Sequence, residues 1–318
     1  MQVSGMPMAA VLGSGTMGAQ IALSLALGGF DIRLWGRRAE ALPDAMDRVG
    51  AAFDFLAEAG LAEPGNRPLV LSRIKATSDL EEAVCDAGFV IEAVAEDIAV
   101  KQSLLGAAET HAASDAVLSS TTSALSATEI QSSLARPDRF CVAHYAQPAH
   151  LVELVEVVPG QQTAAGVTEF VTRLLTDTGK TPVLCPDIPG FLWARIQHAV
   201  LREFASLVGQ GLVTAEACDT ILKVGYASRL PAMGAFEHAD LAGLDLINSA
   251  AAKAVWADLS NVMDPGDTPV GELYEQGHLG MESGHGFYDW TQRDPGTFRM
   301  QRDAEIIRRI KIRRQDAG

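Results

Sequence analysis

A glycine-rich turn near the start of the chain strongly limits the folds that this sequence can adopt. A short apolar stretch, residues 8–12, is followed at once by GSGTMG and then by a helical apolar run that ends near residue 28. Gly-x-Gly-x-x-Gly between a strand and a helix is typical of a loop that binds the pyrophosphate of a dinucleotide, because glycines let the backbone approach and the helix N-terminus carries partial positive charge. We therefore expect cofactor contacts from Gly13, Ser14, Gly15, Thr16, Met17 and Gly18.

Strands and helices alternate through the N-terminal half of the chain. Apolar strands are expected at 31–35, 89–91 and 116–118, and a helix at 39–61 is followed by a loop at 63–68. This alternation is typical of α/β proteins in which helices cover both faces of a parallel sheet. We predict a doubly wound, Rossmann-type domain over residues 1–186. A break rich in proline and glycine then leads into a second, all-α domain over residues 187–318.

The residue after the second strand bears on the choice of cofactor. NAD-specific proteins commonly place Asp or Glu about 20 residues beyond the glycines, where the carboxylate binds the ribose. This chain has Gly36 at that place, followed by Arg37 and Arg38, whose guanidinium groups suit a 2′-phosphate. We predict NADP as the cofactor. NAD is the alternative, since a small residue at this position can serve either.

Two short strands joined by a turn, FCVAHYAQPAHLVELVEVVP at 140–159, carry the strongest candidates for catalysis. Alternation along the second strand places Glu156 on an otherwise apolar face. An unpaired buried carboxylate costs several kcal/mol or becomes neutral, and His144 is the partner within reach across the turn. An imidazole held in this way suits a group that accepts a proton from an alcohol. The alternative is a hydrogen-bonded core histidine, with Glu156 bound to backbone.

Two further segments follow strand ends, the edge at which ligands bind in open sheets of this type. The first contains Glu96, with Lys101 further along, and both are candidates for cofactor binding. The second is SSTTSAL at 119–125, in which the hydroxyl of Ser123 can hydrogen-bond a substrate oxygen. The alternative for this second segment is an N-capping loop before a helix at 127–134.

Composition argues against several classes of partner. A formal net charge of −15 disfavours nucleic acid, because such binding depends on a basic surface that neutralises phosphates. No apolar run approaches the roughly 20 residues of a membrane span, and the first residues lack a secretion signal, so we expect a cytoplasmic protein. The four cysteines lie far apart without a Cys-x-x-Cys pair, so neither a disulfide framework nor a metal site is expected.

In chain order, a set of segments resembles the L-3-hydroxyacyl-CoA dehydrogenase superfamily: GSGTMG, FVIEAVAEDIAVK, SSTTSAL, RFCVAHYAQPAHLVELVEVVPG, IPGFLWARIQHAVLREF and GHGFYDW. The resemblance covers nearly the whole chain. It implies an oxidoreductase that transfers a hydride between a nicotinamide and a CH–OH group, and a second domain that forms a homodimer. It also implies His144 as the base, Glu156 as its partner, Ser123 on the substrate oxygen and Glu96 near the nicotinamide.

The chain departs from the family pattern where relatives contact their substrate. Gln147 stands in place of an Asn before Pro, Ala194 in place of an Asn before Arg, and Thr121 in place of the Asn of N-T-S. The stretch 45–62, a basic helical arm in the acyl-CoA enzymes, has one cation against three carboxylates here. We therefore predict a small free hydroxy acid as substrate, as in the branch of gulonate, carnitine and pyridine-carboxylate dehydrogenases.

Two arginines of the second domain are candidates for binding a substrate carboxylate, Arg195 and Arg229, because a guanidinium offers that group a two-pronged match. Arg195 recurs with His198 and Arg202 along one helical face, for which a solvated stripe or a subunit contact is the alternative. Two other functions stay open. One is an acyl-CoA or acyl-carrier-protein dehydrogenase, and the other is a non-catalytic relative of the lens crystallin type.

Overall fold

The computed structural model describes residues 8–316, which divide into two compact units. The first contains the chain up to Arg195 together with the segment from Asp303 onward, and the second spans Ile196–Arg302. The predicted fold class, a doubly wound sheet domain followed by a helical one, is confirmed. The predicted boundary lies between residues 186 and 187, whereas in this division residues 187–195 and the segment from Asp303 onward pack with the sheet unit.

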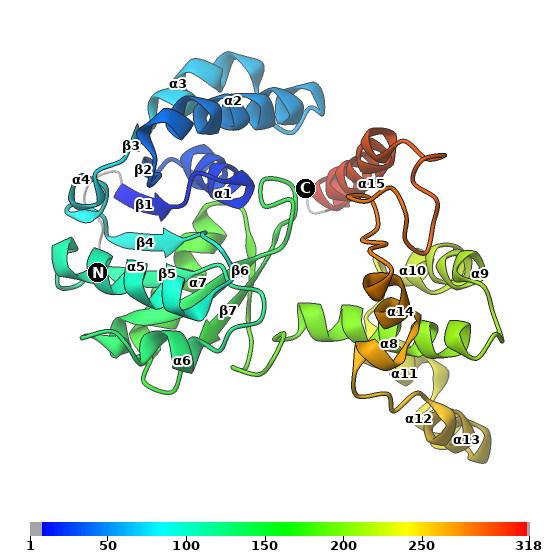
Figure 1. Cartoon of the computed structure of the whole chain (residues 1–318). Helices are drawn as coiled ribbons and strands as arrows, with labels where there is room; N and C mark the ends of the chain where they lie inside the picture. Colours follow the sequence, from blue (N-terminus) through cyan, green and yellow to red (C-terminus); the bar gives the residue numbers. More distant parts are fainter. Residues whose placement is uncertain (1–7, 317–318) are drawn as a thin grey trace. The chain divides into compact units, whose positions relative to one another are not determined.

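The first unit is built on a sheet of eight strands in the order β3-β2-β1-β4-β5-β6-β7-β8 (Figure 1). The strands are β1 (Met8–Leu12), β2 (Asp31–Trp35), β3 (Ile74–Thr77), β4 (Phe89–Glu92), β5 (Val117–Ser120), β6 (Phe140–Tyr145), β7 (Leu154–Pro159) and β8 (Thr181–Leu184). Neighbouring strands pair in parallel except β6 and β7, which pair antiparallel. The strand order reverses between β1 and β4, which is where sheets of this type bind ligands.

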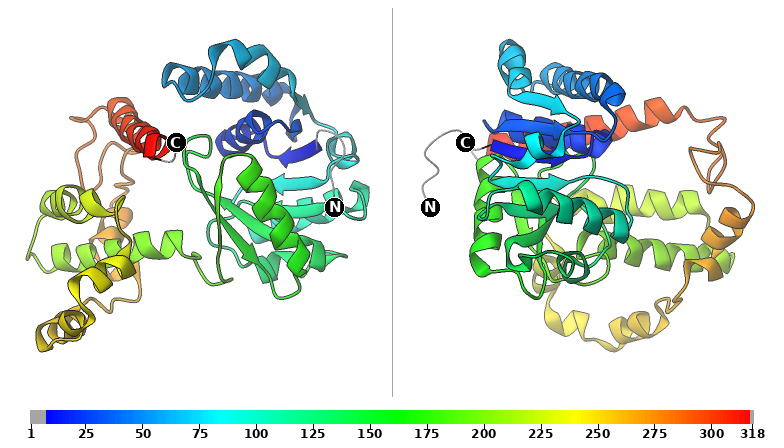
Figure 2. Two further views of the ribbon diagram at one scale, coloured as in Figure 1. Left: turned by 180° about the vertical axis from the view of Figure 1, so that it is seen from behind. Right: turned by 60° about the vertical axis from the view of Figure 1, so that its left-hand side comes forward.

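Helices cover both faces of this sheet. One face carries α1 (Thr16–Leu27), α2 (Leu42–Glu58), α3 (Arg67–Ser72) and α7 (Ala165–Asp177), and the other carries α4 (Leu80–Val84), α5 (Ile98–His111) and α6 (Ala127–Gln131). Successive residues of β1 alternate between the two cores, with Ala9 and Val11 in the first and Ala10 and Leu12 in the second. Figure 2 shows α7 lying against the sheet when the unit is seen from behind.

Several predicted elements have different limits in the structure, including the strands expected at 89–91 and 116–118, which extend to residues 92 and 120. The helix expected at 39–61 is a short turn, η1 (Ala39–Ala41), followed by α2. The loop expected at 63–68 contains η2 (Pro64–Asn66) and the start of α3, because proline is well tolerated in the first turn of a helix. The helix expected at 127–134 ends at Gln131.

The last helix, α15 (Pro295–Asp316), explains why the C-terminal segment belongs to the sheet unit. Ile306 and Ile307 pack against the hydrophobic core on the face of the sheet that carries α1, α2, α3 and α7, and Ile310 is buried. Arg313 forms an ion pair with Glu153, with 3.0 Å between Nη2 and Oε2. The basic side chains of this helix from residue 308 onward are exposed and form its solvated face.

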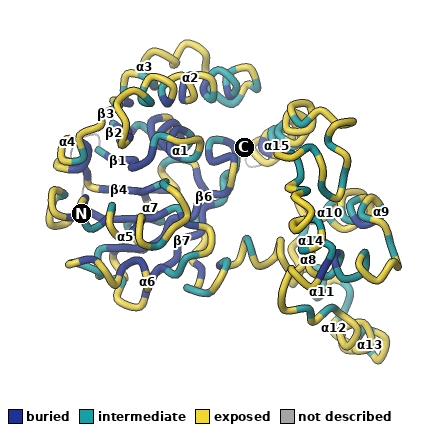
Figure 3. The backbone as a smooth tube through the Cα atoms, viewed as in Figure 1, coloured by how far each residue is buried: buried dark blue, intermediate teal, exposed yellow. Residues whose placement is uncertain are grey.

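The second unit is helical. It contains most of α8 (Trp193–Gly209), followed by α9 (Ala215–Thr220), η4 (Ile221–Tyr226), α10 (Ala227–Arg229), α11 (Ala235–Ala242), α12 (Leu244–Ile247), α13 (Ala250–Asp258), η5 (Pro265–Asp267) and α14 (Pro269–Glu275). Figure 3 shows the contrast between the buried strands of the sheet and the exposed helices α12 and α13. Among the described residues, no helix combines the length and apolar character needed to span a bilayer.

A buried lysine stabilises the turn between β6 and β7. The ammonium of Lys180 donates to the carbonyl oxygens of Ala149 at 2.6 Å and Val152 at 3.0 Å. It also lies 5.8 Å from the centre of the Tyr145 ring. Burial lowers the pKa of Lys180 to about 8, and the charge of Glu153 opposes this shift.

Lys180 should therefore make stability depend on pH. Between about pH 8 and 10.5 the unfolded chain binds a proton at this lysine that the folded protein has released, so the free energy of unfolding should rise with pH. The rise should reach at most about 3 kcal/mol. Urea unfolding of the wild type and of Lys180→Met across this range measures it as a growing difference. A difference that stays constant with pH would contradict the assignment.

Candidate active site

His144 and Glu156 lie directly opposite each other on the antiparallel pair β6 and β7. Both side chains are buried, and 2.8 Å separates Nδ1 of the imidazole from Oε2 of the carboxylate. The hydrogen bond fixes the ring and leaves Nε2 on its opposite side. The predicted partnership across the turn is present because the register of the hairpin places these two positions side by side.

The hydroxyl of Ser123 lies at the other side of the ring, 3.1 Å from Nε2 of His144. Ser123 is exposed, in the loop that follows β5. The three residues predicted to be catalytic therefore form one chain from an accessible hydroxyl, through an imidazole, to a buried carboxylate. A proton arriving at Nε2 would produce an imidazolium whose charge Glu156 balances.

The second oxygen of Glu156 holds the start of α8. Oε1 accepts from the backbone N–H groups of Leu192 at 2.9 Å and Trp193 at 2.8 Å. Burial favours the neutral carboxyl, but the hydrogen bonds from His144, Trp193 and Leu192 outweigh it and keep the pKa of Glu156 below its ordinary value. Cys185 also approaches Oε1, at 3.5 Å. Burial and the neighbouring carboxylate raise the pKa of Cys185 to about 12, so it donates as a thiol.

Glu96 and Lys101 act on the loop that carries Ser123. Oε1 of Glu96 accepts from the Thr122 hydroxyl and, at 3.0 Å, from the backbone N–H of Ser123. Burial alone would raise the pKa of Glu96, but Thr122, Lys101 and the Ser123 N–H together hold it below its ordinary value. The ammonium of Lys101 is buried 3.2 Å from Oε2 of Glu96. Lys101 thus influences the site through Glu96.

Three residues that the sequence analysis did not single out support this arrangement. Glu92, at the end of β4, is fully buried and pairs with Lys101 at 3.0 Å. Asp187 accepts from the backbone N–H groups at the start of α6, at 2.9 Å, and so anchors the chain that leads to α8. Gln20 of α1 accepts from the N–H of Ala149 at 2.9 Å. A carboxylate at the end of an apolar strand is a sequence signal that could have identified Glu92. Asp187 and Gln20 have partners 59 or more residues away, so no local pattern identifies them.

The glycine-rich loop borders a cavity of about 890 Å³ at the point where the strand order reverses. Gly13 has a φ of +136°, and a Cβ there would lie 2.4 Å from the carbonyl oxygen of Ala93, so only glycine fits. A Cβ on Gly18 would lie 1.7 Å from the carbonyl oxygen of Gly13, which is the close packing of helix on strand. Gly15 faces open space. This geometry suits a pyrophosphate above Gly15 and the start of α1.

The charges around this cavity also suit a dinucleotide. Its lining residues are Gly13, Ser14, Gly15, Trp35, Arg37, Arg38, Ala41, Ala93, Val94, Ala95, Ala99, Val100, Ser103, Leu104 and Ala107. Two of these are arginines and none is acidic. Of the other residues predicted to bind cofactor, Thr16, Met17 and Gly18 begin α1, Gly36 is buried behind Ser14, and Glu96 and Lys101 serve the Ser123 loop.

The residues predicted to bind substrate are divided between the two units. Gln147 is exposed in the turn after β6, and Ala194 lies in the first turn of α8. Arg195 is exposed and donates to the carbonyl of Pro189 at 3.3 Å. Arg229 belongs to the second unit, where Nη1 lies 3.4 Å from Nε2 of His238. Their role in binding substrate stays a prediction.

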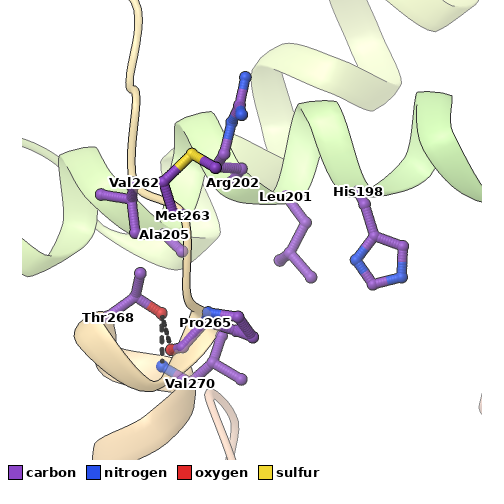
Figure 4. A pocket seen from close by; sticks show the side chains of 9 residues that line it. All are labelled: His198, Leu201, Arg202, Ala205, Val262, Met263, Pro265, Thr268 and Val270. Atoms are coloured by element: carbon purple, nitrogen blue, oxygen red, sulfur yellow. Dashed lines mark hydrogen bonds between the residues drawn. The ribbon is translucent and has the colours of Figure 1, made fainter. Parts of the chain in front are cut away.

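The second unit has a smaller cavity of about 230 Å³ beside α8 (Figure 4). Its lining is mainly apolar and consists of His198, Leu201, Arg202, Ala205, Val262, Met263, Pro265, Thr268 and Val270. Both basic residues of the predicted stripe that lie in this unit, His198 and Arg202, are at its rim and exposed.

Comparison with known families divides the chain in the same way as its motifs. Residues 8–188 match the NAD binding domain of 3-hydroxyacyl-CoA dehydrogenase, and residues 190–290 match the C-terminal domain of the same enzyme family. The two matches together account for most of the chain.

The chain matches two curated relatives over nearly their whole length. The chain is 30% identical over 299 residues to the 5-formyl-3-hydroxy-2-methylpyridine 4-carboxylate 5-dehydrogenase of Mesorhizobium japonicum, over 94% of this chain and 95% of that protein. It is 32% identical over 281 residues to a probable 3-hydroxybutyryl-CoA dehydrogenase of Deinococcus radiodurans, over 88% of this chain and 99% of that protein.

Solved structures agree with this assignment. A 5-formyl-3-hydroxy-2-methylpyridine 4-carboxylic acid 5-dehydrogenase, described as an NAD+ dependent dismutase, superposes with a TM-score of 0.88 at 28% identity over 99% of both chains. The (S)-3-hydroxybutyryl-CoA dehydrogenase from Ralstonia eutropha gives 0.75 at 26% identity, over 90% of this chain and 99% of that one. This chain therefore belongs to the 3-hydroxyacyl-CoA dehydrogenase family and is a nicotinamide-dependent oxidoreductase with an NAD-binding domain.

Proposed function

We propose that this enzyme transfers a hydride between a nicotinamide and the secondary alcohol or ketone of a small hydroxy acid. The two hydrogen bonds that link Ser123, His144 and Glu156 are the main support for this proposal. In the oxidation direction, Nε2 of His144 accepts the hydroxyl proton, Glu156 balances the imidazolium at Nδ1, and Ser123 holds the substrate oxygen. The bound nicotinamide supplies the hydride acceptor. The presence of all three hydrogen-bonded residues also argues against a non-catalytic, crystallin-like role.

The preference for a free acid over an acyl-CoA rests on the helical arm at 45–62. Its one cation, Arg48, donates to the carbonyl of Ser14 at 2.8 Å. The neighbouring Arg67 pairs with Asp54, with 2.6 Å between Nε and Oδ1. Both guanidinium groups are thus engaged within the protein, and Asp47 and Glu58 are exposed on the same arm. Such a surface is unfavourable for the phosphates of CoA.

The relatives support two different substrate classes. The relative from M. japonicum is named for a small pyridine carboxylate, which agrees with the free-acid proposal. The relative from D. radiodurans is named for 3-hydroxybutyryl-CoA, so a 3-hydroxyacyl-CoA dehydrogenase is the second candidate.

NADP is the cofactor that the charges at the cavity favour. Arg37 and Arg38 line the cavity and are exposed, and none of the described residues that line it is acidic. A guanidinium binds a 2′-phosphate well, whereas a carboxylate would repel it. NAD is the alternative, since the solved relative with a TM-score of 0.88 is described as NAD+ dependent.

His144→Gln should lower turnover by about three orders of magnitude or more, because glutamine cannot accept the alcohol proton. The dissociation constant of the reduced cofactor should change little. Steady-state kinetics and nicotinamide fluorescence measure the two effects. His111→Gln, a change at an exposed histidine of α5, is the matched control. Turnover of the His144 variant within tenfold of the wild type would place the base elsewhere.

Titration of the protein with NADPH and NADH should show at least about tenfold tighter binding of NADPH, which corresponds to about 1.4 kcal/mol from the arginine contacts. Small keto acids, including pyridine carboxylates that bear a carbonyl, should then oxidise the bound cofactor faster than acetoacetyl-CoA. Tighter binding of NADH together with rapid oxidation by acetoacetyl-CoA would instead assign ordinary hydroxyacyl-CoA chemistry.

We also propose that the protein is a homodimer through its second unit. Large apolar side chains are exposed on α11, α12 and α13, among them Phe236 at 89%, Leu244 at 63% and Trp256 at 73%. Exposed apolar surface of this kind favours a protein interface.

Sedimentation equilibrium should give twice the chain mass for the wild type. The double variant Phe236→Asp, Trp256→Asp should give the mass of one chain, because it places two charges in the proposed interface. Leu69→Asp, at an exposed leucine of α3, should leave the mass unchanged. A wild type that sediments as a monomer at micromolar concentration would refute the proposal.

A further inference from the structure

Position 36, directly after β2, has no room for a side chain. A Cβ built on Gly36 would lie 2.6 Å from Oγ and 2.9 Å from Cβ of Ser14, and 2.8 Å from Cδ2 of Leu42. The end of the leucine can rotate away, and so can the hydroxyl. The Cβ of Ser14 can move only with its backbone, so a side chain at position 36 would displace the glycine-rich loop.

Position 36 requires glycine because a side chain would have no space there. The backbone conformation at this position is compatible with other residues. Gly36 is not among the described glycines with positive φ. Its N–H donates to the carbonyl of Thr77 at 3.1 Å, an ordinary continuation of the strand. Gly36 therefore differs from Gly13, where φ and space both demand glycine.

The backbone of Ser14 is held from two sides. Arg48 of α2 donates to its carbonyl oxygen at 2.8 Å. The preceding residue, Gly13, donates its N–H to the carbonyl of Trp35 at 2.9 Å. The loop and the end of β2 are thus interlocked, and the loop cannot retreat from position 36 without breaking hydrogen bonds.

We infer that Ser14 and Gly36 form a single specificity-determining contact at the adenosine end of the cofactor. Ser14 closes the position from which a carboxylate would bind the ribose hydroxyls, and it lines the cavity beside Arg37 and Arg38. The ribose is then bound by the Ser14 hydroxyl and the two guanidinium groups, a set suited to a 2′-phosphorylated adenosine. This inference rests on the proposed cofactor site and adds that preference can be reversed only by changing both positions together.

A double-mutant cycle tests the coupling. Dissociation constants for NADPH and NADH are measured for the wild type, Gly36→Asp, Ser14→Gly and the double variant. Gly36→Asp alone should weaken both cofactors at least tenfold, because the aspartate displaces the loop. Adding Ser14→Gly should restore NADH binding at least tenfold relative to Gly36→Asp, while NADPH stays weak because the new carboxylate repels its 2′-phosphate.

If Gly36→Asp fails to fold, two further variants still allow the coupling between positions 14 and 36 to be tested. Gly36→Ala introduces only the Cβ that meets Ser14, and Ser14→Gly should rescue its cofactor binding in the same way. Gly65→Asp, at an exposed glycine with no heavy atom within 4 Å of its built Cβ, reports the general effect of a Gly→Asp change on thermal unfolding. Recovery of folding in the double variant would itself demonstrate the contact.

The outcomes separate this inference from the cofactor proposal. Tighter binding of NADH by the wild type would overturn the NADP preference, yet the NADH cycle would still report whether positions 14 and 36 are coupled. Gly36→Asp alone gaining NADH affinity, with additive effects throughout the cycle, would overturn the inference whatever the wild-type preference is.

Discussion

The carboxylate of Glu156 is the group on which the rest of the site depends. A buried charge is tolerable only when its hydrogen bonds are satisfied, and here an imidazole takes one oxygen while two backbone N–H groups and a thiol approach the other. The orientation of His144 and the start of α8 are therefore set by one side chain. This is the physical reason that the sheet unit extends to Arg195 and does not end at the proline and glycine break.

A second network of ion pairs and hydrogen bonds, buried at Glu92 and Lys101 and exposed at Glu96, sets the position of Ser123. Glu92 holds Lys101, Lys101 holds Glu96, and Glu96 accepts from the backbone of Ser123. Each charged group in the network has a partner, which makes the network rigid. A buried charge without a partner would instead destabilise the fold. The elements involved end at the same edge of the sheet, which brings residues from β4, β5 and β6 together although they are distant in sequence.

The cofactor end of the site shows how local charge can differ from net charge. The protein carries a formal charge of −15, yet the described lining of the large cavity has two arginines and no carboxylate. The polyphosphate of a dinucleotide is attracted by nearby groups and by the start of α1, because exposed charges beyond a Debye length are largely screened. The acidic helical arm lies on α2, the helix whose Arg48 is bound to Ser14.

Some features of the fold and the site can be predicted from local sequence patterns alone. The limits of β1 and β2, the glycine-rich loop, and the pairing of His144 with Glu156 follow from periodicity and from a hairpin whose partners are 12 residues apart. The contacts between distant segments form only in the folded structure: Asp187 with α6, Gln20 with the turn between β6 and β7, Lys101 with two carboxylates, and Ser14 with Gly36. No periodic pattern encodes such contacts, because they arise only when the sheet brings its loops to one edge.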